Sequence, residues 1–185
     1  MAESSVPAVL LDRDGVINRR RVDHVKSWSE FEFLPGVLPA LAVLHAMQTR
    51  VAVITNQGAV GRGLLSAPDL DRIHTRMARA IRAAGGRLDG IYACPHAPTQ
   101  GCACRKPAPA LFYQASADLG IRLSGSIFVG DSPSDVQAAR AAGCRPVLID
   151  EHGGDVDQDV IAVKSLGEAV TVWRDLVVPV GSTRC

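Results

Sequence analysis

The 185-residue sequence has few aromatic residues and almost no net charge. Phe, Trp and Tyr together make up 4% of the chain, and the formal net charge is +1 at pH 7. A nucleic-acid-binding module typically shows a basic face with stacking aromatic side chains, and an anionic membrane surface attracts strongly basic proteins. The composition therefore argues against nucleic acid and against a membrane surface as partners.

Long apolar runs, internal repeats and low-complexity tracts are also missing. No apolar run approaches the length of about 18 residues that suggests a membrane span. Residues 1–5 show no basic region followed by an apolar stretch, so we expect no secretory signal and a cytoplasmic protein. Neither a heptad pattern nor an apolar stripe argues for a dimer, so we expect a monomer. The chain has 47% apolar residues and is long enough to form a single domain, residues 1–185, with a sizeable core.

Short apolar runs alternate along the chain with segments of helical periodicity. Strands are predicted at 9–11, 51–55, 91–93, 126–130, 145–149 and 160–163. Helices are predicted to begin at 36, 66, 109, 132 and 166. This alternation is typical of an α/β fold whose mostly parallel sheet is covered by helices on both faces. Ligands of such sheets bind beyond the carboxyl ends of the strands.

Acidic residues follow two of the predicted strands. Asp12 and Asp14 point to the same side of an extended chain, and their mutual repulsion requires a cation, a shared proton or both. With Asp131 they form a set of three carboxylates that suits a hard divalent ion such as Mg²⁺. A solvated acidic turn is the alternative for the first pair, and a helix-start residue for Asp131. For Asp135, a capping box with Ser132 is an equally good explanation.

Polar groups suited to phosphate lie at the second strand end and near residue 105. Thr55 and Asn56 offer a hydroxyl, an amide and turn N–H groups, although the same pair is common in ordinary turns. Lys106 can neutralise a phosphoryl group, whereas an Arg105–Lys106 pair is also a common solvated surface feature.

Three of the five cysteines fall within eleven residues, beside a histidine. The odd number and the clustering favour a metal site over a disulfide framework. Three thiolates and an imidazole complete a tetrahedral, structural Zn²⁺ site, the alternative being free thiols and a surface histidine. Such a site would hold Arg105 and Lys106 in place. We expect Cys144 in the core and Cys185 on a terminal tail. The proposed zinc ligands are Cys94, His96, Cys102 and Cys104.

Taken together, these motifs resemble those of the haloacid dehalogenase (HAD) superfamily of phosphatases. The D-x-D-G-[TV] motif lies at 12–16, the Ser/Thr motif at Thr55, the lysine at Lys106 and the G-D-x-x-x-D motif at 130–135. One branch contains D-glycero-D-manno-heptose 1,7-bisphosphate 7-phosphatase and the histidinol-phosphatase domain, and the sequence is similar to it in four further motifs. These are F-E-F at 31–33, T-N-Q at 55–57, the C-x-H and C-x-C loop at 94–104, and R-K-P at 105–107.

The resemblance implies a Rossmann-like three-layer sandwich without a large cap domain. The parts that shape the site would be a flap at about 15–33 and the zinc loop at 94–104. Asp12 would form an aspartyl-phosphate, and Asp14 would be the general acid and base. Mg²⁺ would be held by Asp12, Asp131 and the backbone carbonyl of Asp14. The residues implied to bind the substrate and its phosphate are Thr55, Asn56, Gln57, Arg105 and Lys106.

The resemblance also implies a substrate, D-glycero-D-manno-heptose 1,7-bisphosphate, from which the 7-phosphate would be removed. Histidinol phosphate is the alternative substrate. A non-catalytic zinc-loop binding module and a catalytically dead scaffold are readings of a different class. The segment 56–63 departs from the usual N-Q-S-G-I-A-R-G pattern, and 19–21 is an unusual run of three arginines. We hypothesise that these arginines contact a second anionic group, such as the 1-phosphate of a bisphosphate.

Overall fold

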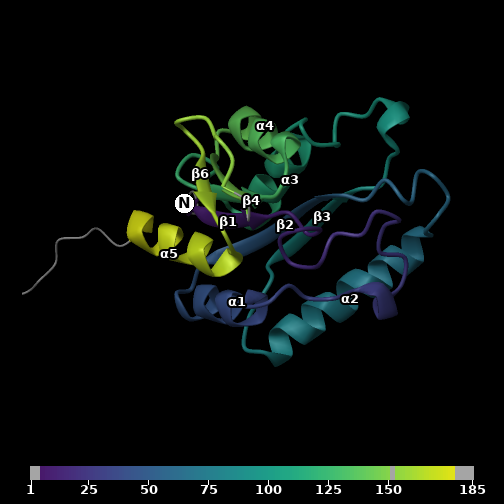
Figure 1. Cartoon of the computed structure of the whole chain (residues 1–185), viewed down its shortest axis with the longest axis horizontal. Coiled ribbons are helices and arrows are strands. Elements are labelled where there is room, and N and C mark those ends of the chain that lie inside the picture. Colours follow the sequence, from purple (N-terminus) through teal and green to yellow (C-terminus); the bar gives the residue numbers. More distant parts are fainter. Residues whose placement is uncertain (1–4, 151–152, 178–185) are drawn as a thin grey trace, which may run out of the picture.

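The computed structural model describes residues 5–150 and 153–177 and contains a six-stranded sheet with the order β3-β2-β1-β4-β5-β6 (Figure 1). All five pairings between neighbouring strands are parallel. The strands are β1 (Ala8–Leu11), β2 (Arg50–Asn56), β3 (Gly90–Cys94), β4 (Ile127–Gly130), β5 (Arg145–Ile149) and β6 (Ile161–Val163). The α/β prediction with a parallel sheet is confirmed, and no cap domain interrupts the described part of the chain.

Five α-helices cover the sheet, with α1, α2 and α5 on one face and α3 and α4 on the other (Figure 1). They are α1 (Val37–Ala46), α2 (Ala67–Ala83), α3 (Ala110–Leu119), α4 (Pro133–Ala142) and α5 (Leu166–Val177). Alternate residues of β1 point to opposite faces, so that Leu11 packs with the first group of helices and Leu10 with the second. A strand buried on both faces needs an uninterrupted apolar run, which is what the sequence provides. None of the helices in the described ranges is long and apolar enough to cross a membrane.

Helix ends follow the local chemistry of the chain. Ser66 caps α2, because its Oγ accepts a hydrogen bond from the Asp69 N–H at 3.2 Å. Gly120 and Gly143 end α3 and α4 in the left-handed conformation. Cys144, which follows α4, is buried as expected, and Cys185 lies outside the described residues.

The strand register brings the predicted site residues to one edge of the sheet. Leu11 is aligned with Val53 of β2 and with Val129 of β4, so β1 and β4 end at nearly the same level, whereas β2 continues to Asn56. Asn56, the last residue of β2, is aligned with Cys94, the last residue of β3. The sheet therefore places the zinc loop beside the loops that follow β1 and β2.

The flap, residues 15–33, returns to the sheet edge after β1. A bridge between Asn18 and Phe33 closes its base. Its aromatic side chains form a small cluster in which Trp28 stacks on Phe31 and Phe33 meets both rings edge-on. The flap is thus anchored by its own packing beside the carboxyl end of β1.

Candidate active site

A buried ion triad lies where β1 and β4 end. The Lys106 ammonium is 2.9 Å from Asp12 Oδ1 and 2.7 Å from Asp135 Oδ1. Lys106 is only 4% exposed, and both carboxylates are buried as well. Two hydrogen bonds fix Asp12 at the end of β1: its N–H donates to the Val129 carbonyl oxygen at 2.8 Å, and its Oδ1 accepts from the Arg13 N–H at 2.7 Å. The triad is therefore rigid and water-poor.

Burial and charge act against each other within this triad. Burial alone would lower the pKa of Lys106, but the Asp12 and Asp135 carboxylates outweigh it and raise that pKa above its ordinary value. Burial raises the pKa of Asp12, since the Lys106 charge is opposed by the neighbouring Asp135 and Asp14 carboxylates. Lys106 thus stays charged, whereas the carboxylates around it remain short of positive charge.

Asp14 lies in a different electrostatic environment although it is only two residues away. The Arg13 guanidinium donates from Nη2 to both Asp14 oxygens at 2.8 and 2.9 Å. Asn18 Nδ2 and Gln57 Nε2 donate to the same carboxylate at 2.9 and 2.8 Å. Burial would raise the pKa of Asp14, but Arg13 and these hydrogen bonds together lower it below its ordinary value. The two motif carboxylates are therefore held in chemically distinct states.

Asp131 completes a group of three carboxylates with Asp12 and Asp135, whose oxygens lie within 4.8 Å of one another. Gly15 makes this arrangement possible: its φ is +88°, and a Cβ there would lie 1.7 Å from Asp131 Oδ2. Burial, opposed by Arg20 and reinforced by Asp12 and Asp135, raises the pKa of Asp131 to about 7. A hard divalent cation with oxygen ligands would relieve this repulsion, so the donor set fits Mg²⁺.

The end of β2 supplies a second set of polar groups. Asn56 and Lys106 bind each other reciprocally: Lys106 N–H donates to Asn56 Oδ1 at 3.0 Å, and Asn56 Nδ2 donates to the Lys106 carbonyl oxygen at 3.2 Å. Gln57 Nε2, besides its bond to Asp14, donates to Thr55 Oγ1 at 2.9 Å. Gln57 thus contacts the Asp14 carboxylate and Asn56 contacts the Lys106 backbone, whereas Thr55 is linked to the acidic centre through Gln57.

A cavity of about 520 Å³ opens above the acidic centre. Its lining includes both motif carboxylates, and positive charge is contributed by Arg20 and Arg21 of the flap and by Arg105 and Lys106. Arg20 also pairs with Asp131. The third flap arginine, Arg19, pairs instead with Glu32 on the exposed outer side. Only two of the three arginines at 19–21 therefore line the cavity.

The zinc loop brings its four candidate ligands together. Their sulfur and Nδ1 atoms lie 3.2 to 3.6 Å apart in the contacts among Cys94, His96, Cys102 and Cys104. Ligand atoms at the corners of a tetrahedron around Zn²⁺ are about 3.5–3.8 Å apart, given Zn–S bonds of about 2.3 Å. The cluster fits a structural zinc ion. Arg105 follows the last cysteine directly, and its Nη1 donates to the His96 carbonyl oxygen at 3.2 Å.

Two residues of this site were not in the predicted set. Asp135 has the spacing of a capping box with Ser132, but no side-chain hydrogen bond caps α4 at Ser132; the Asp135 carboxylate accepts from the Asp131 N–H at 3.2 Å and faces Lys106. The G-D-x-x-x-D spacing was the available signal. Arg13 occupies the variable position of the D-x-D-G motif and is 1% exposed, and no local pattern indicated that it would be buried against Asp14.

Comparison with known proteins agrees with this geometry. A family model described as HAD-hyrolase-like matches residues 103–169. The D-glycero-beta-D-manno-heptose-1,7-bisphosphate 7-phosphatase of Bordetella bronchiseptica is 41% identical over 168 residues, which is 91% of this chain and 92% of that protein. The D-glycero-alpha-D-manno-heptose-1,7-bisphosphate 7-phosphatase of Mycobacterium bovis is 43% identical over 150 residues, covering 76% and 78%.

A solved structure extends the likeness to three dimensions. The D,D-heptose 1,7-bisphosphate phosphatase of B. bronchiseptica, crystallised with magnesium and phosphate, superposes with a TM-score of 0.84 at 37% identity, covering 90% of this chain and 97% of that one. Fold and site together define a phosphatase of the HAD superfamily. The non-catalytic zinc-loop module is set aside on this ground. Within the superfamily, the chain belongs to the D-glycero-D-manno-heptose-1,7-bisphosphate 7-phosphatase family.

Proposed function

We propose that this chain removes the 7-phosphate of D-glycero-D-manno-heptose 1,7-bisphosphate by way of an aspartyl-phosphate. The observation that carries the proposal is the pairing of two unlike carboxylates: Asp12 against the buried Lys106, and Asp14 against Arg13. We assign Asp12 as the nucleophile and Asp14 as the proton carrier. The names of the relatives support the choice of a heptose bisphosphate.

In the first step Asp12 attacks phosphorus. Its Oδ1 is occupied by the Arg13 N–H and by Lys106, so we assign the attack to Oδ2. The bond from phosphorus to the sugar oxygen breaks as the new bond to Asp12 forms. Asp14 gives a proton to the departing oxygen, which leaves as the sugar hydroxyl; because Arg13 lowers the pKa of Asp14 in the free site, this step requires Asp14 to take up a proton when the phosphate substrate binds. The intermediate holds the phosphoryl group on Asp12.

In the second step water attacks the aspartyl-phosphate and Asp14 takes the proton from it. The Oδ2–phosphorus bond breaks, which returns the Asp12 carboxylate and releases inorganic phosphate. We assign Lys106 and the Thr55 hydroxyl to stabilising charge on the phosphoryl oxygens. Mg²⁺, held by Asp12, Asp131 and the Asp14 carbonyl, with Asp135 beside them, would supply positive charge toward the phosphoryl group when bound.

The sugar would lie in the cavity between the flap and the zinc loop. Asn56 is positioned by Lys106 and Arg105 by His96, and we assign both to substrate positioning together with Gln57. Arg20 and Arg21 of the flap line the cavity and are assigned to the second phosphate of a bisphosphate. We further propose that the chain acts as a single-domain, monomeric, cytoplasmic enzyme. Light scattering of the purified protein would test whether it is a monomer.

The test is phosphate release from a panel of substrates, with Mg²⁺ and with EDTA. The panel holds both anomers of the heptose bisphosphate, fructose 1,6-bisphosphate and histidinol phosphate, and Asp12→Asn is the inactive control. We expect preference for one heptose anomer and its loss with EDTA or Asp12→Asn. Preference for histidinol phosphate would keep the mechanism and reject the substrate. No release from any compound by folded protein would reject the proposal.

A further inference from the structure

Arg13 is a buried guanidinium with partners on two sides. On one side it forks onto the Asp14 carboxylate, with Nε at 3.3 Å and Nη2 at 2.8 Å from Oδ1. On the other side its Nη1 lies 3.2 Å from Nε2 of His74, a residue 61 positions away on α2. A buried charge needs all its hydrogens satisfied, so both partners matter to where the guanidinium lies.

The contact fixes the protonation state of His74. Because arginine nitrogens only donate, His74 Nε2 must accept, which leaves the imidazole neutral with its proton on Nδ1. The charged groups that act on this ring are Arg13 and, beyond it, Asp14. Burial, together with Arg13, lowers the pKa of His74 to about 4, in agreement with a neutral ring near pH 7.

We propose that His74 is a positioning residue for the phosphatase reaction: by accepting from Arg13 it holds the guanidinium, and through it the Asp14 carboxylate, in the orientation needed for proton transfer. This inference rests on the proposed function, since it assigns a role within that reaction. The chain of contacts runs from α2 through the loop after β1 to the active-site cavity.

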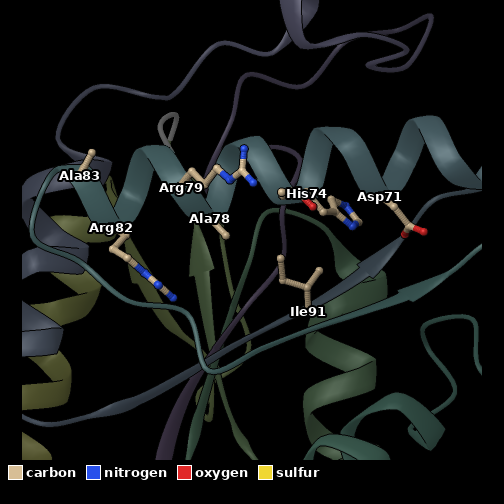
Figure 2. A pocket seen from close by; sticks show the side chains of 8 residues that line it. Asp71, His74, Ala78, Arg79, Arg82, Ala83 and Ile91 are labelled. Carbon is tan, nitrogen blue, oxygen red and sulfur yellow. The ribbon is translucent and has the colours of Figure 1, made fainter.

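His74 occupies this place because α2 carries it into the core side of the molecule. It lines a groove of about 750 Å³ between α2 and β3, together with Arg79 of the same helix and Ile91 of the strand (Figure 2). Arg79 is exposed and makes no contact with Arg13 among the described interactions. Arg79 is therefore a matched control for His74. Both residues lie on α2 and line the same groove, but among the described interactions only His74 contacts Arg13.

Removing the acceptor has a specific consequence. In His74→Leu one Nη1 hydrogen of the buried Arg13 loses its partner, and the guanidinium is free to shift toward other acceptors. Asp14 then loses its two-pronged anchor, although Asn18 and Gln57 still donate to it. A displaced proton carrier slows the chemical step without weakening substrate binding, because Asn56, Arg105 and the flap arginines, which are assigned to the substrate, lie outside this network.

The experiment compares wild type, His74→Leu, His74→Gln and Arg79→Leu in steady-state phosphate release on the best substrate of the panel. We expect kcat of His74→Leu to fall about tenfold to a hundredfold with KM within about twofold. His74→Gln places an amide oxygen near the Nε2 position and should restore most of kcat, and Arg79→Leu should match wild type. Equal kcat for wild type and His74→Leu, or no recovery in His74→Gln, would overturn the role.

A second measurement is independent of activity. Nitrogen-15 NMR of the His74 ring at pH 7 should show the Nδ1–H tautomer, and the Nε2–H tautomer or a charged ring would overturn the proposal. If His74→Leu does not fold, Arg13→Lys replaces it, because lysine keeps the charge but cannot fork onto Asp14 while reaching His74. An inactive wild type would reject the proposed function, whereas an active wild type with an unchanged His74→Leu would reject only this role.

Discussion

Replacing Lys106 by methionine should destabilise the protein strongly, and in a way that depends on cations and pH. Methionine fills nearly the same volume, so packing against Phe128, whose ring lies 5.0 Å from the Lys106 ammonium, is largely kept. What is lost is the charge between Asp12 and Asp135. Two buried carboxylates then face each other without compensation.

The magnitude follows from the burial of the group. Breaking a buried ion pair by removing one partner costs about 3–5 kcal/mol, because the remaining charge stays desolvated. For a chain of this length each kcal/mol shifts Tm by about 2–4 °C, so we expect a fall of about 6–20 °C in EDTA at pH 7.5. Mg²⁺ should recover part of it, since a divalent ion can replace the missing positive charge.

Differential scanning fluorimetry and urea unfolding, each with EDTA and with Mg²⁺, measure both effects. Without Lys106 the pKa of Asp12 in the folded state rises further above its unfolded value, so between these two pKa values the folded state binds more protons than the unfolded state. The variant therefore loses stability as pH rises through this range. At low pH the difference in stability between Lys106→Met and wild type should shrink. Asp135→Asn, which removes one of the two carboxylates, should lessen the deficit in the double variant. A Lys106→Met protein as stable as wild type in EDTA would refute the reasoning.

Three further outcomes are expected. Metal analysis should find one zinc per chain, and Cys104→Ser should lose it and raise KM, because the loop no longer fixes Arg105; an unchanged KM in zinc-free protein would contradict this. As pH falls from about 6.5 to 4, His74 should lower the free energy of unfolding by about 3 kcal/mol, because its pKa in the folded protein is lowered to about 4 and the unfolded state binds the proton first. Urea unfolding at several pH values should show that the free energy of unfolding of His74→Gln depends less on pH over this range. Arg21→Ala should raise KM for bisphosphates several-fold but not for monophosphates, whereas Arg19→Ala, which removes an exposed side chain paired with Glu32, should change neither.

The elements of the fold could be predicted because their signals are local. A strand buried on both faces requires a run such as Val9–Leu11, and Ser66 or Gly143 marks a helix end through its own backbone chemistry. Once the sheet was parallel, the strand-end rule also placed Asp12 and Asp131 near each other. What was predicted well thus depends on neighbours in the sequence or on sheet topology.

The unpredicted parts depend on contacts between distant side chains. Asp135 has the spacing of a helix cap, and it can turn to Lys106 because Gly130 has no side chain; a Cβ there would lie 2.2 Å from the Asp135 Cβ. The link from Arg13 to His74 spans 61 residues and no local periodicity encodes it. The flap arginines looked like one unit, whereas in the structure Arg19 and Arg20 pair with different acidic residues.

The charges around the two motif aspartates explain why one half of the site needs a divalent ion and the other does not. Asp12 and Asp135 share the buried ammonium of Lys106, and Asp131 pairs with the half-exposed Arg20, so the three carboxylates still outnumber the positive charges in this water-poor pocket. Asp14 has Arg13 to itself, and that pair is already neutral. A divalent cation therefore suits the first group in the sign of its charge as well as in ligand type, whereas the Asp14 side chain is oriented by hydrogen bonds from Arg13, Asn18 and Gln57. The proposed nucleophile and the proposed proton carrier, two residues apart, therefore depend on different partners: Asp12 on Lys106 and the divalent ion that its group would hold, and Asp14 on a buried hydrogen-bond network that reaches α2.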